Sequence, residues 1–154
     1  MQQMWQPVKI KETLALITLA ICVYTDIKDR YIYVMPLVIS GAGGILISLI
    51  SALCFSDGSV LIYDIALPIA AGAALVAASH VREDHIGAGD GILVAAVGLL
   101  VGIRTDVFSL LAGLAVVPLY AAVKRLTGKK RFVRSVPFAP FMMTGYMFVL
   151  INEL

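Results

Sequence analysis

The chain has 154 residues, of which 60% are hydrophobic and only 14% are charged, with a formal net charge of +2. Soluble domains are roughly 45–50% apolar and about 25% charged, so this composition excludes a water-soluble globule and a disordered chain. A nucleic-acid-binding domain is also excluded, because it needs a basic surface. We therefore expect residues 1–154 to form a single polytopic domain, an all-α integral membrane protein.

Charged and turn residues divide the chain into six apolar segments that no charge interrupts. These segments are Thr13–Thr25, Tyr31–Ser56, Ile65–Ser79, Gly91–Ile103, Val107–Val123 and Ser135–Asn152. A spanning helix needs about 20 residues, so the shorter segments must extend at one end. We expect the first helix to begin near Val8, with Lys9 and Lys11 reaching the interface. The third should begin near Val60, and the fourth should extend back through Asp90. The sequence thus predicts about six transmembrane helices with short loops.

The basic residues predict the orientation. Six of the twelve Lys and Arg residues follow the fifth segment, namely Lys124, Arg125, Lys129, Lys130, Arg131 and Arg134. The positive-inside rule makes this loop cytoplasmic, where it can contact anionic membrane lipids. Alternation then puts Asp26 and Asp90 at the cytoplasmic side. The same alternation puts both termini and the Asp57–Gly58 and Arg104–Asp106 turns outside, so we expect Asp64 to be an ordinary helix-end residue there.

The strongest local pattern is Gly87-Ala-Gly89-Asp90, at the entrance of the fourth helix. Glycines permit a tight backbone and leave space for a substrate to approach the carboxyl group. An ionisable residue at a membrane interface is a candidate functional residue. The alternative interpretation is an aspartate that only caps an ordinary helix.

The second pattern runs from Asp26 through Lys28 and Arg30. Two carboxyl groups can hydrolyse a peptide bond when one accepts a proton from water and the other, protonated, polarises the carbonyl. We expect Asp26 to be the partner of Asp90 in such a pair. The alternatives are a solvated loop with local ion pairs, or Asp29 in place of Asp26.

A third pattern, Val136 to Phe141, follows the basic loop and includes Pro137, Phe138 and Pro140. Taken alone, this pattern is explained by two prolines at the N-terminus of an ordinary helix. Cys22 and Cys54 lie far apart, and the two histidines have no metal-ligand spacing around them. The sequence therefore predicts no metal site and no cofactor.

Together, the three patterns resemble the type IV prepilin peptidases, which are membrane aspartyl proteases. In that family an aspartate precedes a basic stretch and Ile-Pro-Asn, a GxGD motif opens a later helix, and Pro-Phe-Gly-Pro-Phe follows. Order and spacing agree over nearly the whole chain. The resemblance implies that Asp26 and Asp90 are catalytic, with Gly87, Gly89 and Lys28 among the supporting residues. It assigns the same supporting role to Arg30, Pro137, Phe138 and Pro140.

The resemblance further implies an enzyme of the bacterial inner membrane that removes the short basic leader from a prepilin or pseudopilin. Tyr33 and Val34 replace the family's Pro-Asn, and Gly91 and Ile92 replace Val-Lys after the second aspartate. The paired CxxC motifs linked to N-methylation are absent, which implies a peptidase-only member.

Two other functions remain open. A small transporter or secretion-channel subunit could use the same carboxyl groups for protons or ions. A presenilin-type GxGD protease would use a Tyr-Asp motif, for which the sequence offers Tyr63-Asp64.

Overall fold

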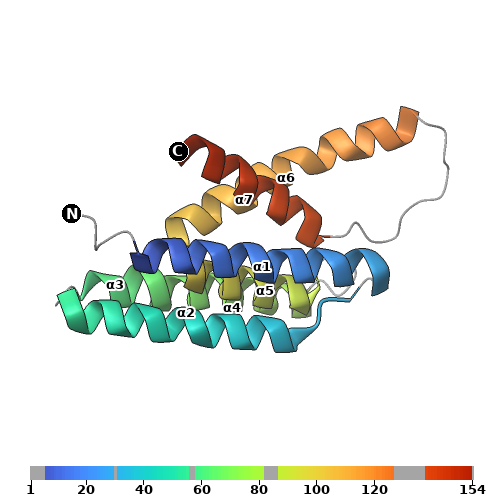
Figure 1. Ribbon diagram of the computed structural model, residues 1–154. Coiled ribbons are helices and arrows are strands. Elements are labelled where there is room, and N and C mark those ends of the chain that lie inside the picture. Colours follow the sequence, from blue (N-terminus) through green and yellow to red (C-terminus); the bar gives the residue numbers. More distant parts are fainter. Residues whose placement is uncertain (1–5, 30, 56–57, 82–86, 127–137, 154) are drawn as a thin grey trace.

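The computed structural model describes residues 6–29, 31–55, 58–81, 87–126 and 138–153. The elements are α1 (Gln6–Asp29), α2 (Val34–Phe55), α3 (Ser59–Leu61), η2 (Ile62–Ala66, a π-helical turn), α4 (Leu67–Val81), α5 (Ala88–Val101), α6 (Ile103–Leu126) and α7 (Phe138–Glu153) (Figure 1). Because α3, η2 and α4 continue one another, these elements make six helical passes. No strand occurs in the described ranges, and the all-α prediction is confirmed.

Three stretches are long and apolar enough to cross a membrane: Val34–Cys54, Ser59–His80 and Ile103–Tyr120. The helices α5 and α7 are apolar but shorter. Large apolar side chains are exposed along the outer faces of the helices, Leu53 and Ile151 among them. Such a surface suits lipid rather than water, and the prediction of an integral membrane protein is confirmed.

The predicted helix extensions also agree with the structure. The first helix begins at Gln6, the third pass at Ser59, and α5 at Ala88, two residues before Asp90. Lys9 is exposed, as expected of a residue that reaches the interface. Lys11 is not: its side chain is buried inside the bundle, so that part of the prediction is wrong.

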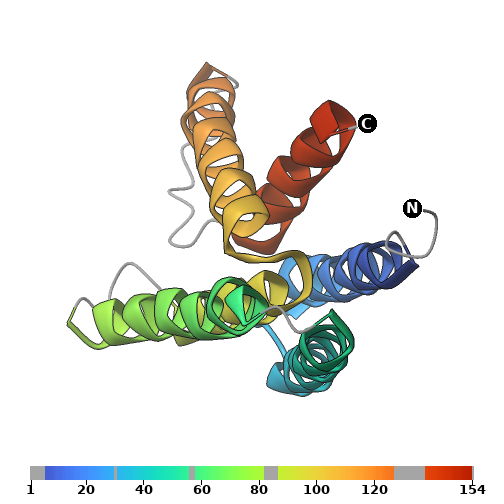
Figure 2. The same cartoon turned by 90° about the vertical axis from the view of Figure 1, so that its left-hand side faces the viewer.

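The helix α5 forms the centre of the fold. It contacts α1, α2, α4 and α6, and most of its residues are buried. A helix that is apolar all round is suited to such a buried position, and α5 is also too short to be one of the three candidate spans. The pair α6 and α7 leans away from the other four passes, as Figure 2 shows, and α7 reaches back to contact α1.

Successive passes run in opposite directions. The ends of α1, α4 and α6 therefore lie at the same end of the molecule as the beginnings of α2, α5 and α7, on the right in Figure 1. This arrangement brings Asp26, Asp90 and Phe138 to one end of the fold, which we call the α5 entrance. The opposite end holds the beginning of α1 and the turn from α5 to α6.

Glycines allow the helices to cross closely. A Cβ atom on Gly91 would lie 2.9 Å from the carbonyl oxygen of Gly72, and one on Gly145 would lie 2.6 Å from the backbone nitrogen of Gly113. On α2, a Cβ on Gly44 would lie 2.7 Å from the carbonyl oxygen of Leu99. Neighbouring backbone therefore prevents any side chain at these three crossings.

We expect Gly145→Ala to lower the free energy of unfolding by about 1–3 kcal/mol, because the added methyl group must push α7 away from α6 backbone. Gly43→Ala is the matched control, since its Cβ would lie 3.5 Å from a Leu14 side-chain atom, an ordinary contact. Thermal unfolding in detergent measures both. A parental melting temperature for Gly145→Ala would contradict the close crossing.

Candidate active site

Asp26 lies in the last turns of α1 and is buried, with 7% of its surface exposed. Its Oδ2 atom accepts a hydrogen bond of 2.9 Å from the backbone N–H of Ala139. Ala139 is the second residue of α7, where backbone N–H groups have no acceptor within the helix. The positive end of the helix dipole also favours a carboxylate at this position. The first turn of α7 thus positions Asp26.

Asp90 lies in the first turn of α5 and is half-buried. Its Oδ2 atom accepts a hydrogen bond of 3.2 Å from the backbone N–H of Gly87, the N-cap residue. The backbone N–H of Asp90 in turn donates to the Gly87 carbonyl at 3.0 Å. Asp90 is therefore the N3 residue of a capping box, and not the N-cap residue of the simpler interpretation.

The electrostatics of Asp90 go beyond helix capping. Asp90 lies outside the three candidate spans. Burial raises its pKa from 3.8 to about 6, although the Gly87 N–H lowers it and the negative charge of Asp26 raises it further. Two carboxyl groups that interact in this way resist simultaneous ionisation. The state with one ionised and one protonated carboxyl group is therefore populated up to about pH 6.

The glycines of the GxGD pattern do not give it a strained backbone. Gly87 has φ −77° and ψ 139°, which any residue can adopt, and among the described residues only Gly102 has a positive φ. The Gly87 backbone therefore does not itself require a glycine. A Cβ on Gly87 would lie 3.5 Å from Asp90 Oδ2, and one on Gly89 would lie 3.5 Å from Ile32 Cβ. The absence of a side chain at Gly87 leaves space directly beside the carboxyl group.

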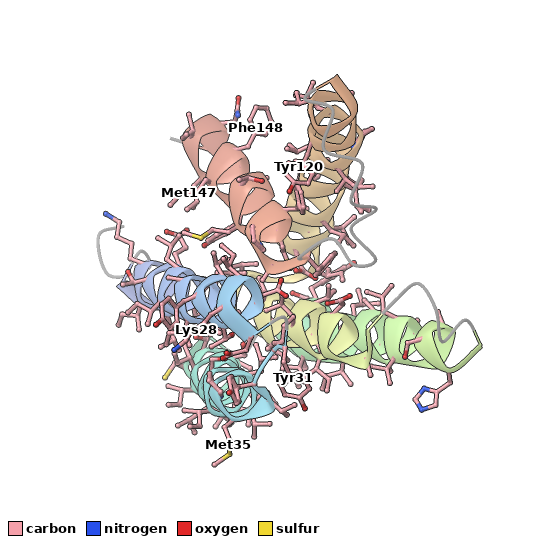
Figure 3. All side chains as sticks on the ribbon, turned by 90° about the vertical axis from the view of Figure 1, so that its right-hand side faces the viewer. Lys28, Tyr31, Met35, Tyr120, Met147 and Phe148 are labelled. Carbon is pink, nitrogen blue, oxygen red and sulfur yellow. The ribbon has the colours of Figure 1, made fainter. Side chains whose placement is uncertain are left out.

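The basic residue Lys28 does not join the two aspartates. Its side chain is exposed, with Nζ 5.6 Å from the centre of the Tyr24 ring. Figure 3 views this end of the molecule, with Lys28 on α1 and Tyr31 just before α2. Asp29 is also exposed, and its Oδ2 atom lies 3.5 Å from the Tyr33 hydroxyl. Burial therefore distinguishes Asp26 from the alternative Asp29.

The third sequence pattern, Val136 to Phe141, contacts Asp26 through a backbone N–H group. Phe138 and Pro140 are half-buried in the first turn of α7, on either side of the N–H that binds Asp26. Phe138 packs against the apolar core. Pro137 and Arg30 lie outside the described residues, as does His85. The other histidine, His80, is exposed and bonds to a carbonyl of its own helix.

A polar cluster that the sequence did not predict lies at the opposite end. Lys11 Nζ donates to Asp64 Oδ2 at 2.9 Å and to Ser48 Oγ at 2.7 Å. Asp64 lies at the end of the fold opposite Asp90, as expected, and its ion pair with Lys11 is an addition that the sequence did not predict. A Cβ on Gly102 would lie 3.3 Å from Asp64 Oδ1, so Asp64 lies at the far end of α5 from Asp90. The only sequence signal was a pair of opposite charges inside two predicted helices.

Within the described ranges, no three His, Cys, Asp or Glu side chains gather in a group that could hold a metal ion. No family model, curated protein or solved structure matches the chain. The function must therefore be argued from the site itself.

Proposed function

We propose that this chain is a membrane aspartyl endopeptidase of the prepilin peptidase type, with Asp26 and Asp90 as its catalytic pair. The observation that carries the proposal is the convergence of the three sequence patterns at the α5 entrance. Asp26 is bonded to the first turn of α7, and its charge acts on Asp90 in the first turn of α5. Ordinary helix capping accounts for Asp90 but not for the buried carboxylate beside it.

The geometry assigns a role to each carboxyl group. Asp26 is the general base, because the Ala139 N–H and the α7 dipole stabilise its ionised form. Asp90 is the general acid, because its raised pKa keeps a proton available. Asp26 removes a proton from water, the water attacks the peptide carbonyl, and Asp90 gives its proton to the carbonyl oxygen. Asp26 then gives the proton it took from water to the leaving amine, and Asp90 recovers a proton from a hydroxyl of the tetrahedral intermediate as the C–N bond breaks and the carboxyl product forms.

The substrate in this proposal is a prepilin or pseudopilin, a precursor with a short basic leader before an apolar helix. The apolar helix would lie in the lipid beside the protein, and the leader would meet the α5 entrance. We place that entrance at the cytoplasmic face of the bacterial inner membrane, from the position of the basic loop.

The alternative functions fit this arrangement less well. A transporter would place its acids near the membrane midplane between repeated halves, whereas Asp26 and Asp90 lie at one end of the fold. A presenilin-type protease would pair Asp90 with Asp64, but these residues lie at opposite ends of α5.

The test is cleavage of a pilin-like precursor by the purified chain in liposomes, after treatment with a strong chelator. We expect a new N-terminus directly after the leader, identified by mass spectrometry, and no effect of the chelator. Two carboxyl groups suffice for this hydrolysis. A folded chain that leaves the precursor intact, or that needs added zinc, would contradict the proposal.

The pH dependence of precursor cleavage should reflect the protonation of Asp90. Because Asp90 must be protonated, we expect kcat/KM to fall as the pH rises through about 6. Gly87→Pro removes the N–H that lowers the pKa of Asp90, and the Gly87 backbone already suits proline. This variant should move the fall to higher pH. A fall at the same pH in both proteins would show that another group titrates.

A further inference from the structure

At the end opposite the α5 entrance, Asp106 is a buried acid that the proposed peptidase does not use. It lies in the first turn of α6 and is fully buried, with no exposed surface. Neither carboxyl oxygen has a hydrogen-bond partner among the residues that the structure describes. Nearly all buried polar atoms in proteins are paired, so an unpaired carboxyl group inside a membrane domain requires an explanation.

A glycine and a proline lie close to the Asp106 carboxyl group. A Cβ on Gly98 would lie 3.0 Å from Asp106 Oδ2 and 2.8 Å from Pro68 Cβ. The carboxyl group therefore fits against a helix position that carries no side chain, beside a proline that offers no N–H. One turn further along the chain, Gly102 lies beside Asp64. Two carboxyl groups thus contact successive turns at the C-terminal end of α5.

The charges at this end do not balance Asp106. The Lys11 ammonium already pairs with Asp64 and also binds Ser48. Other titratable side chains described on α6 and on the elements packed against it are Tyr63 of η2, His80 of α4, Asp90 of α5, Arg104 and Tyr120 of α6, and Tyr146 of α7. His80 and Arg104 are exposed, and Asp90 lies at the other end of α5. Within the described chain, no hydrogen bond or ion pair joins any of these groups to Asp106.

We propose that Asp106 is a proton-binding site, occupied at neutral pH, so that the residue is a neutral carboxylic acid inside the protein. An ionised carboxylate here would lack water, hydrogen bonds and a counter-ion, which is the most costly state for a buried acid. The negative end of the α5 dipole favours the neutral form, whereas the positive end of the α6 dipole favours the ionised form, so the helix dipoles oppose each other here and desolvation decides. A metal ion would need several further oxygen ligands, whereas a proton needs none.

This site should react with an apolar carbodiimide such as dicyclohexylcarbodiimide. The acid proton moves to one carbodiimide nitrogen, and the carboxylate oxygen bonds to the central carbon. The acyl group then shifts from that oxygen to the other nitrogen, giving a stable N-acylurea without loss of any atom. No further reactant is needed. The Asp64 carboxyl group is instead held in an ion pair by Lys11, so we expect no adduct there.

The experiment uses the whole chain in liposomes at neutral pH. We expect mass spectrometry to find the carbodiimide adduct on Asp106 and not on Asp64. Infrared spectra should contain a protonated-acid carbonyl band that loses intensity in Asp106→Asn and keeps its intensity in Asp64→Asn. The adduct is measured on the parent protein, so this result stands even if Asp106→Asn does not fold.

Two results would overturn the proposal. The first is an acid band that is identical in the parent and in a folded Asp106→Asn variant, because Asp106 is then ionised. The second is suppression of the adduct by sodium ions at constant pH, because a bound cation then occupies the site. Neither result depends on peptidase activity, so this inference and the proposed function can fail separately.

Discussion

Asp26→Asn and Asp90→Asn are each expected to lower kcat/KM for precursor cleavage by about 10²–10⁴-fold. Each substitution keeps the size of the side chain but removes the group that must accept or donate a proton. Asp26→Asn also loses the charge that the Ala139 N–H binds. Cleavage of a pilin-like precursor by matched amounts of each purified variant measures the loss.

Asp29→Asn is the matched control, because Asp29 lies in the same turn of α1 as Asp26 but is exposed. We expect it to retain nearly the parental rate. Both Asn variants should insert and purify like the parent, since neither changes a helix crossing. If Asp29→Asn lost activity and Asp26→Asn retained it, the two-carboxyl mechanism would stand, but the partner of Asp90 would be Asp29 and not Asp26.

Ala139→Pro should lower kcat/KM by about 10- to 100-fold. The substitution removes one backbone N–H, the donor to Asp26. This N–H has no acceptor within α7, so the helix itself loses no hydrogen bond. Hydrogen bonds to charged groups contribute roughly 1.5–3 kcal/mol, and about 1.4 kcal/mol corresponds to a factor of ten.

Ala139 is fully buried, so the added volume of proline needs its own control. Ala139→Val adds similar bulk but keeps the N–H. We expect the valine variant to retain most of the activity under the same assay. Equal losses in the proline and valine variants would mean that packing, and not the hydrogen bond to Asp26, explains the effect.

Length and apolar pattern were sufficient to predict the helical passes. A spanning helix has a minimum length, so the short segments at Gly91 and Ile65 had to extend, and they extend to Ala88 and Ser59. Alternation of the passes was also sufficient to place Asp26 and Asp90 at the same end. Their catalytic role stays a prediction that the experiments above address.

The rest of the site depends on contacts that a sequence pattern does not encode. The donor to Asp26 is a backbone N–H, which every residue except proline carries, so nothing singled out Ala139. The rotation of α1 decides whether Lys11 faces lipid or Asp64, and apolar residues all round a helix give no preferred face. The sequence also does not say which glycine lies at a crossing: a Cβ on Gly145 would meet neighbouring backbone, whereas one on Gly43 would make only an ordinary contact.

The most direct test of the catalytic pair is the cleavage rate of the double variant Asp26→Asn/Asp90→Asn, compared with each single variant. Two groups that act as one unit give non-additive losses. We therefore predict that the double variant cleaves the precursor at nearly the same residual rate as either single variant. A shared aspartyl mechanism would be contradicted if the rate loss of the double variant equalled the product of the two single losses. Substantial cleavage by Asp90→Asn alone would contradict it as well.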